Sequence, residues 1–183
     1  MSNEDLENKF EKNFILYLKK YKKILITFLI ILISLPSILF FLEHKSEKQN
    51  KKISEKFYQA NFHASDKKFD EAKKLLIEVI NEKNIFYSPL SLNLILDKKI
   101  YNENEEIIIL FQKVLSIKGL DNDQKDLIKL KRGLFFLEKN DVLNFVSELE
   151  SIYNSNSIWK NKARSILKNY YLTRGEIENA NKY

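Results

Sequence analysis

The sequence predicts an all-α protein in which one N-terminal transmembrane helix precedes a row of stacked helical hairpins, an α-solenoid. Three observations support this fold class. Residues 24–42 carry no charge, the 183 residues include only three glycines and two prolines, and apolar side chains after residue 46 recur at helical spacing between short polar breaks. Because sheet proteins need frequent turn residues, this composition favours helices joined by short polar turns.

Residues 1–23 are predicted to form an amphipathic segment. A helix that lies among lipid headgroups, or that docks on a membrane partner, has one apolar stripe. A plain helical extension of the following segment explains the stripe equally well. The apolar side chains that recur every three or four residues here, opposite a face of Glu, Lys and Asn, are Leu6, Phe10, Phe14, Tyr17, Leu18 and Tyr21.

Residues 24–42, with the sequence ILITFLIILISLPSILFFL, are predicted to be a transmembrane helix. At ~1.5 Å rise per residue this segment spans about 28 Å, close to the hydrocarbon thickness of a bilayer. Pro36 is expected to kink the helix, which membrane helices tolerate. The side chains expected to anchor the chain in lipid are Ile24, Leu25, Phe28, Leu29, Ile30, Leu32, Leu39, Phe40 and Leu42.

Two other interpretations of this segment fit less well. A core helix that is apolar all round is rare in so small a chain. A cleaved signal peptide has an apolar region of about 7–15 residues followed by small residues, whereas here Leu42 leads directly into Glu43-His44-Lys45. An uncleaved anchor is therefore expected. Lysines crowd its N-terminal flank at positions 19, 20, 22 and 23, so the positive-inside rule favours an N-terminus in the cytoplasm.

The distribution of charge argues against nucleic acid as a partner. The formal net charge is +6, but residues 1–23 and 43–56 each contribute +2 around the apolar segment. The remaining residues carry only +2, with both signs interspersed, whereas a nucleic-acid domain concentrates its charge on one face. The chain has no cysteine, which excludes disulfides and cysteine–metal sites.

Residues 43–183 are predicted to form a helical-repeat domain. Aligning the second helices of the hairpins on Phe69, Ile107, Val142 and Ile177 gives separations of 38, 35 and 35 residues. Two helices per unit of this length are typical of tetratricopeptide-type repeats. This spacing predicts three full hairpins and a fourth cut short. The expected helices cover residues 44–64, 69–82, 89–101, 104–117, 122–138, 141–153, 158–173 and 176–183.

Helix starts and core positions follow from the same pattern. We expect Ser88 to cap a helix with Pro89 at its first position, Asp121 or Asn122 to cap the next first helix, and Ser157 to cap the last. The last helix is so short that we expect it to pack on its neighbour, to fray or to be completed by a partner. The predicted core comprises Phe57, Leu76, Leu94, Leu110, Phe111, Leu134, Phe145, Leu149, Trp159, Ile166, Leu167 and Tyr170.

Catalytic and ligand-binding motifs are not evident in the sequence. We therefore expect no catalytic residue, no cofactor, no metal and no small-molecule substrate. His44 and His63 are the only histidines, and neither has a metal-ligand spacing around it. No phosphate-binding glycine loop and no G-x-S-x-G sequence occurs. The acidic clusters near residues 103–106 and 121–123 lie at predicted helix starts, where they interact favourably with the helix dipole. The chain is not expected to be an enzyme.

The end of the chain resembles a known family. Trp159 starts a helix that contains Ala163, and this helix leads to the turn Arg174-Gly175-Glu176 and to a helix with Ala180. This arrangement resembles the bacterial ancillary SecYEG translocon subunits, which are inner-membrane proteins with tetratricopeptide-like repeats. The chain departs from the family in lacking glycine in its first three hairpin turns. The positions expected to pack between repeats are Ala72, Leu76, Trp159, Ala163, Leu167, Tyr171, Gly175 and Ala180.

The resemblance implies a bacterial inner-membrane protein with a single span, a cytoplasmic N-terminus and a periplasmic C-terminal domain. Its partners would be the membrane, a SecYEG-like translocon and periplasmic chaperones. From the repeats alone we expect a membrane-anchored adaptor for protein–protein interactions. A scaffold for cell-envelope or division proteins is the alternative that the sequence leaves open.

Overall fold

The computed structural model describes residues 16, 19–24, 26–27, 32, 44 and 46–183. The chain divides into two units, residues 1–50 and 51–183. The predicted segment 1–23 and the predicted transmembrane helix 24–42 therefore lie largely outside the described residues. Of the nine expected anchor residues, only Ile24 and Leu32 are described, and both are helical and exposed. Among the residues that are described, none of the helices has the length and apolar character needed to cross a membrane. The transmembrane helix remains a prediction.

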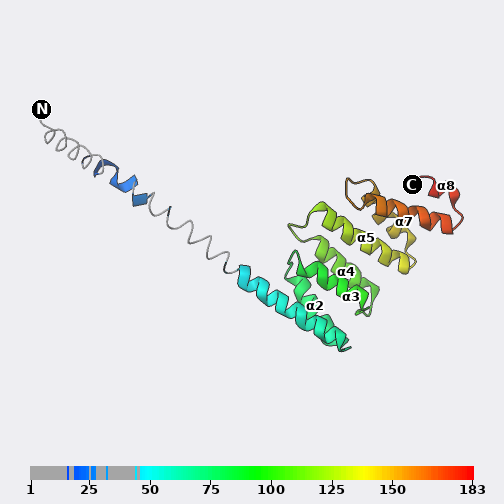
Figure 1. Ribbon diagram of the computed structural model, residues 1–183, viewed down its shortest axis with the longest axis horizontal. Coiled ribbons are helices and arrows are strands. Elements are labelled where there is room, and N and C mark those ends of the chain that lie inside the picture. Colours follow the sequence, from blue (N-terminus) through cyan, green and yellow to red (C-terminus); the bar gives the residue numbers. More distant parts are fainter. Residues whose placement is uncertain (1–15, 17–18, 25, 28–31, 33–43, 45) are drawn as a thin grey trace. The chain divides into compact units, whose positions relative to one another are not determined.

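The second unit consists of α-helices joined by short turns (Figure 1). Residues 46–65 are helical, and we call residues 51–65, which belong to this unit, the first helix. Seven further helices follow in the chain: α2 (Phe69–Asn81), α3 (Tyr87–Asp97), α4 (Asn104–Leu115), α5 (Asn122–Glu138), α6 (Val142–Tyr153), α7 (Lys160–Thr173) and α8 (Ile177–Ala180). The all-α prediction is confirmed for the described residues, which include no strand.

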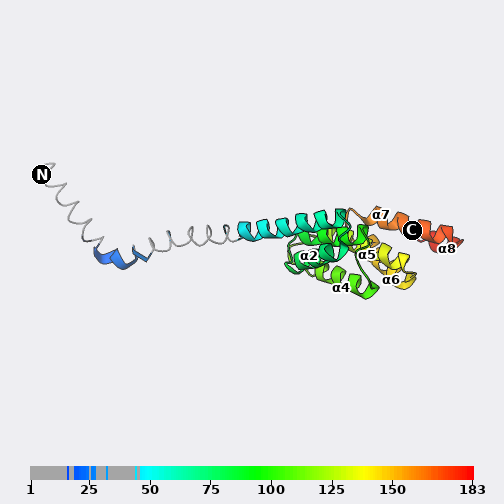
Figure 2. The same ribbon diagram turned by 90° about the horizontal axis from the view of Figure 1, so that it is seen from below.

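Each helix from α2 onward packs against the next one along the chain, and α2 also contacts α4. The helices follow one another along the unit from the first helix to α8, and a second view shows the same succession (Figure 2). One continuous core of buried apolar side chains runs from Ala60 in the first helix to Leu167 in α7. Stacked hairpins that share one core are the arrangement of an α-solenoid, and the structure is consistent with that class.

Four turns end the first helix of each hairpin in the same way. The second residue after the last helical residue has a positive φ: 61° at Lys67, 53° at Lys99, 60° at Asn140 and 74° at Gly175. In all four, the next amide bonds to a carbonyl five residues earlier, which is a Schellman motif. The bonds are Lys68 N to His63 O at 2.9 Å, Ile100 N to Ile95 O at 2.9 Å, Asp141 N to Phe136 O at 2.9 Å and Glu176 N to Tyr171 O at 3.0 Å. Lysine and asparagine thus occupy left-handed positions that usually favour glycine.

The predicted start of α3 is wrong. The helix begins at Tyr87, two residues early, because the Asn84 side chain accepts hydrogen bonds from the amides of Phe86 and Tyr87, both at 2.9 Å. Ser88 is not a cap: it is fully buried and donates to the carbonyl of Val79 in α2 at 3.0 Å. Ser91, one turn later, is also fully buried. These two small side chains let α3 approach α2 closely.

The other two predicted caps fare differently. Asp121 caps α5 in a capping box, in which its side chain accepts from the Gln124 amide at 2.7 Å and the Gln124 side chain accepts from the Asp121 amide at 3.0 Å. The last first-helix, α7, begins at Lys160 rather than 158. Ser157 still accepts a hydrogen bond from the Trp159 amide at 3.2 Å, one turn ahead of the helix.

The predicted repeat-packing positions fall into three groups. Ala72, Leu76, Ala163, Leu167 and Ala180 are fully buried. Trp159 and Tyr171 are half-buried and pack against the core. Gly175 is exposed, and a Cβ built on it would meet nothing within 4 Å, so its place is set by its positive φ and not by packing.

The helices α5 and α6 approach each other closely at Gly133. A Cβ atom on Gly133 would lie 2.3 Å from Leu149 Cδ1 and 3.3 Å from Glu148 Cβ, so only glycine fits without a shift. Beside this contact, the Arg132 guanidinium binds the Glu148 carboxylate at 2.6 Å, and both side chains are largely buried. The position of α5 is therefore fixed by α6.

Candidate functional site

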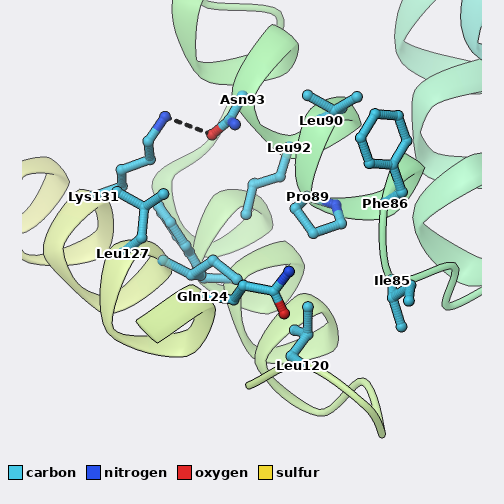
Figure 3. Close-up of a pocket in the computed structure, with 12 residues that line it drawn as sticks. Ile85, Phe86, Pro89, Leu90, Leu92, Asn93, Leu120, Gln124, Leu127 and Lys131 are labelled. Atoms are coloured by element: carbon cyan, nitrogen blue, oxygen red, sulfur yellow. Dashed lines mark hydrogen bonds between the residues drawn. The ribbon is translucent and has the colours of Figure 1, made fainter. Parts of the chain in front are cut away.

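An apolar cavity of about 190 Å³ opens between α3 and α5, the first helices of the second and third hairpins (Figure 3). Nine of its twelve lining residues are apolar, two are neutral amides and one, Lys131, is charged. The lining residues are Ile85, Phe86, Pro89, Leu90, Leu92, Asn93, Phe111, Leu120, Gln124, Leu127, Ile128 and Lys131.

Helical spacing explains why these side chains face one another. On α5 the lining positions 124, 127, 128 and 131 follow the i, i+3, i+4, i+7 pattern of one helix face, and on the α3 side positions 86, 89, 90 and 93 do the same. The floor is closed by buried side chains, among them Leu92 and Phe111. Two apolar stripes therefore face each other across the cavity without filling it.

Lys131 joins the two walls. Its Nζ atom donates to the Asn93 side-chain oxygen at 2.7 Å, which links α5 to α3 (Figure 3). Lys131 also lines a second cavity of about 310 Å³, which lies toward the ends of the two helices and includes Leu96, Asp97, Tyr101, Leu134, Phe135 and Glu138. The two cavities share this lysine and lie along the same two helices, and we call them together the α3–α5 groove.

Exposed aromatic side chains adjoin the groove. Phe86, at its rim, is 62 % exposed, and its ring centroid lies 5.0 Å from that of Tyr87. Tyr87 lies 5.7 Å from Phe57 of the first helix, and Phe57 lies 5.9 Å from Tyr58, which is 64 % exposed. This row of rings extends the apolar surface from the groove to the first helix. Contiguous exposed apolar surface is typical of an interaction site.

A polar cleft of about 620 Å³ lies on another side of α5, against the connection between α6 and α7. Asp126, of which 5 % is exposed, accepts from the Ser155 hydroxyl and from Lys129 Nζ, both at 3.0 Å. Asp123 accepts from the Ile158 amide at 3.1 Å. The cleft is lined by Asp121, Asn122, Asp123, Lys125, Asp126, Lys129, Ser155, Asn156 and Ser157.

The three aspartates of this cleft therefore all have structural partners: Asp121 caps α5, and the other two hold the α6–α7 connection. In the part of the chain that the structure describes, no group of three or more His, Cys, Asp and Glu side chains is arranged to hold a metal ion. The polar cleft therefore has a structural role, since its side chains hold the α6–α7 connection against α5.

A cluster of tyrosines holds the last described residues against α7. Tyr183 is buried, and its ring stacks on Tyr171 at 6.0 Å between centroids and an angle of 3°. Its hydroxyl donates to Glu150, and the Arg164 guanidinium donates to its main-chain oxygen. Burial raises the pKa of Tyr183, and the hydrogen bond to Glu150 raises it further. Burial also raises the pKa of Tyr171. The short helix α8 thus packs on its neighbour, one of the three outcomes expected for it.

The turn Arg174-Gly175-Glu176, which is part of the family resemblance, is closed by an exposed ion pair. The Arg174 Nε atom lies 3.0 Å from a carboxylate oxygen of Glu176, and Asn179 donates to the other oxygen at 2.9 Å. These two hydrogen bonds, that from Asn179 first, lower the pKa of Glu176. The turn has a structural role and places no side chain in the α3–α5 groove.

The α3–α5 groove was not predicted from the sequence. None of the predicted repeat-packing residues lines it, and the prediction that Leu134 belongs to the core is wrong, because Leu134 is 41 % exposed at the groove's second cavity. The available signal was an excess of apolar positions: α3 and α5 each carry a second stripe beside the one that meets the core. Spacing alone did not show which stripe is left uncovered.

No comparison with known proteins bears on the family resemblance, which stays a prediction. Family models, curated proteins and solved structures all give no match to this chain.

Proposed function

We propose that this protein is a membrane-anchored adaptor that binds segments of other proteins in the α3–α5 groove. The observation that supports this most directly is the groove itself, with nine apolar residues lining its first cavity and a row of aromatic rings beside it whose end members, Phe86 and Tyr58, are exposed. Small-molecule sites usually enclose about 300–1,000 Å³. The first cavity, of about 190 Å³, is smaller than this and suits one or two apolar side chains of a protein partner, whereas the second, of about 310 Å³, is at the lower end of that range.

The anchor supplies the second half of the proposal. Residues 24–42 are predicted to cross the membrane, and a tether raises the effective concentration of the domain near membrane partners. The resemblance to ancillary SecYEG subunits favours a translocon accessory role, in which a periplasmic domain links the secretion channel to folding factors. A cell-envelope or division scaffold would use the same groove.

Site-specific crosslinking in native membranes tests the adaptor proposal. A photo-crosslinking amino acid at Leu90 or Leu127 faces the groove, whereas the same amino acid at exposed Lys74 of α2 serves as the matched control. We expect the groove positions to capture a channel component or a folding factor that the control does not. Capture of nothing beyond the control would contradict the proposal, and septal enrichment of the protein would favour the division scaffold.

The anchor is tested separately. Ile30→Arg places a charge in the middle of the predicted span and should cost about 2.5–3.5 kcal/mol of insertion free energy. We expect alkaline carbonate to leave the wild-type chain in membranes and to release the variant. If alkaline carbonate extracted the intact wild-type chain, the membrane anchor would be contradicted, whereas the proposal that the groove binds protein segments would stand.

A further inference from the structure

Lys131 lies in the middle of the α3–α5 groove, between the apolar first cavity and a second cavity that Asp97 and Glu138 line together with apolar side chains. On α5 it stands four residues after Leu127, which lines the first cavity, and three residues before Leu134, which lines the second. Lys131 itself lines both cavities. A segment lying along the groove would therefore have apolar wall on either side of this ammonium group.

Lys131 has a neutral partner, as does Lys113 of α4, whose Nζ donates to the Asn81 side-chain oxygen of α2 at 2.8 Å. Two other half-buried cations at helix–helix contacts pair with carboxylates. Lys73 of α2 binds Glu106 of α4 at 2.7 Å, and Arg132 of α5 binds Glu148 of α6 at 2.6 Å. Lys131 instead donates to the neutral amide oxygen of Asn93. An ammonium group has three donors and a unit charge, so an amide oxygen satisfies one donor and leaves the charge uncompensated.

The carboxylates near the groove do not compensate it either. Asp97 and Glu138 line the second cavity, and Glu138 is bound by Lys99 at 3.5 Å and Lys139 at 3.7 Å. Within the described residues, neither carboxylate forms an ion pair with Lys131, and no carboxylate lines the first cavity. The first cavity thus offers one cation and no carboxylate to a segment that enters it, whereas Asp97 and Glu138 lie in the second cavity.

From this arrangement we infer that the groove recognises an amphipathic protein segment that carries an acidic side chain between its apolar anchors, with Lys131 as the residue that binds the acid. The inference rests on the proposed function, since it names the chemistry of the segment bound in the same groove. Because Lys131 lies between the two cavities rather than at one end, the carboxylate belongs to a side chain within the segment and not to a chain end.

The apolar anchors of such a segment follow from the walls. A large apolar side chain enters the first cavity between Leu90 and Leu127, and a second one lies over Leu134. On a helical segment, residues at i, i+3 or i+4, and i+7 share one face, so an acid between two anchors faces the same way as they do. The apolar walls limit solvent screening of the contact between the carboxylate and Lys131.

Peptide selection on the full-length chain in lipid nanodiscs tests this inference. A phage-displayed library of random amphipathic helices is selected against the wild type, Lys131→Gln and Lys74→Gln. The Lys74 variant removes the same charge from an exposed site on α2. We expect the wild type and Lys74→Gln to enrich peptides with Asp or Glu between apolar residues, and Lys131→Gln to lose that preference. Lys131→Arg, which keeps the charge, should retain it.

Affinities of the selected peptides give the quantitative test. Changing the peptide's acid to its amide should weaken binding to the wild type roughly tenfold, as expected for a charge-assisted hydrogen bond, and should leave binding to Lys131→Gln nearly unchanged. Peptides that need Leu127 but show no preference for an acid would overturn the inference while the adaptor proposal stands. If no selected peptide depends on Leu127, the groove proposal fails as well.

Discussion

Two adjacent residues of α5, Asp126 and Leu127, face two different contacts between helices. Asp126 is buried in the polar cleft, where its two oxygens hold Ser155 and Lys129. Leu127 faces the α3–α5 groove and is only half-buried. The polar cleft is therefore closed by partners from within the chain. The α3–α5 groove instead leaves apolar surface exposed, together with a cation, Lys131, that has no internal partner of opposite charge.

This difference separates residues that stabilise the fold from residues that are available for binding. A buried carboxylate with two partners contributes to stability, and removing it leaves those partners unsatisfied. A half-exposed leucine contributes less to folding and retains apolar surface that a partner can cover. The comparison predicts that substitutions on the two sides of α5 affect different measurements.

The largest expected effect is at the polar cleft. Asp126→Ala should lower the free energy of unfolding by about 2–3 kcal/mol, because Ser155 and Lys129 lose a common buried partner. Urea denaturation of the full-length chain measures this loss. Binding of a groove peptide should be unchanged while the variant is folded. A stability equal to that of the wild type would mean that the cleft does not hold the α6–α7 connection.

The next effect tests the contact between Gly133 of α5 and Leu149 of α6, which positions α5 beside both the polar cleft and the α3–α5 groove. Gly133→Ala should lower the free energy of unfolding by about 1–3 kcal/mol, since the new methyl group overlaps Leu149. At an uncrowded helix position the same change would stabilise by up to about 1 kcal/mol, so even the sign is informative. Adding Leu149→Ala should reduce the cost of the methyl group, as a double-mutant cycle would show.

A smaller effect on stability, with a clear effect on binding, is expected on the groove side. Leu127→Ser should change the free energy of unfolding by less than about 1 kcal/mol and should weaken peptide binding roughly tenfold or more. Fluorescence anisotropy with a selected peptide measures the affinity. Leu172→Ser, at an exposed leucine of α7 outside the groove, is the matched control. Equal effects of the two substitutions on binding would remove Leu127 from the site.

The smallest effect is a gain in stability at the turn that ends α3. Lys99 has a φ of 53°, a conformation that costs a non-glycine residue roughly 1 kcal/mol, so Lys99→Gly should raise the free energy of unfolding by about 0.5–1 kcal/mol. Its contact with Glu138 is exposed and contributes little. A thermal melt measures the gain. Lys98→Gly, at the right-handed position next to Lys99, should give no gain in this measurement.

Much of the helical framework followed from the sequence. The predicted helix 122–138 matches α5, and the predicted helix 69–82 differs from α2 by one residue. Repeated apolar spacing determines that a segment is helical and which of its faces is apolar, and scarce glycine and proline determine that turns are short. Sequence alone did not reveal that Lys67 and Lys99 adopt left-handed conformations, because the cost of such a turn is offset by the packing of both its helices.

What only the tertiary structure decided is which apolar faces are covered. Leu76 and Leu134 are both predicted core positions, yet Leu76 is fully buried in the core, and Leu134 lies exposed between α3 and α5. Ser88 has the sequence signature of a helix cap and lies instead in a close contact with α2. The spacing of one helix describes its own faces, whereas the width of the gap to its neighbour depends on side chains that are distant in sequence.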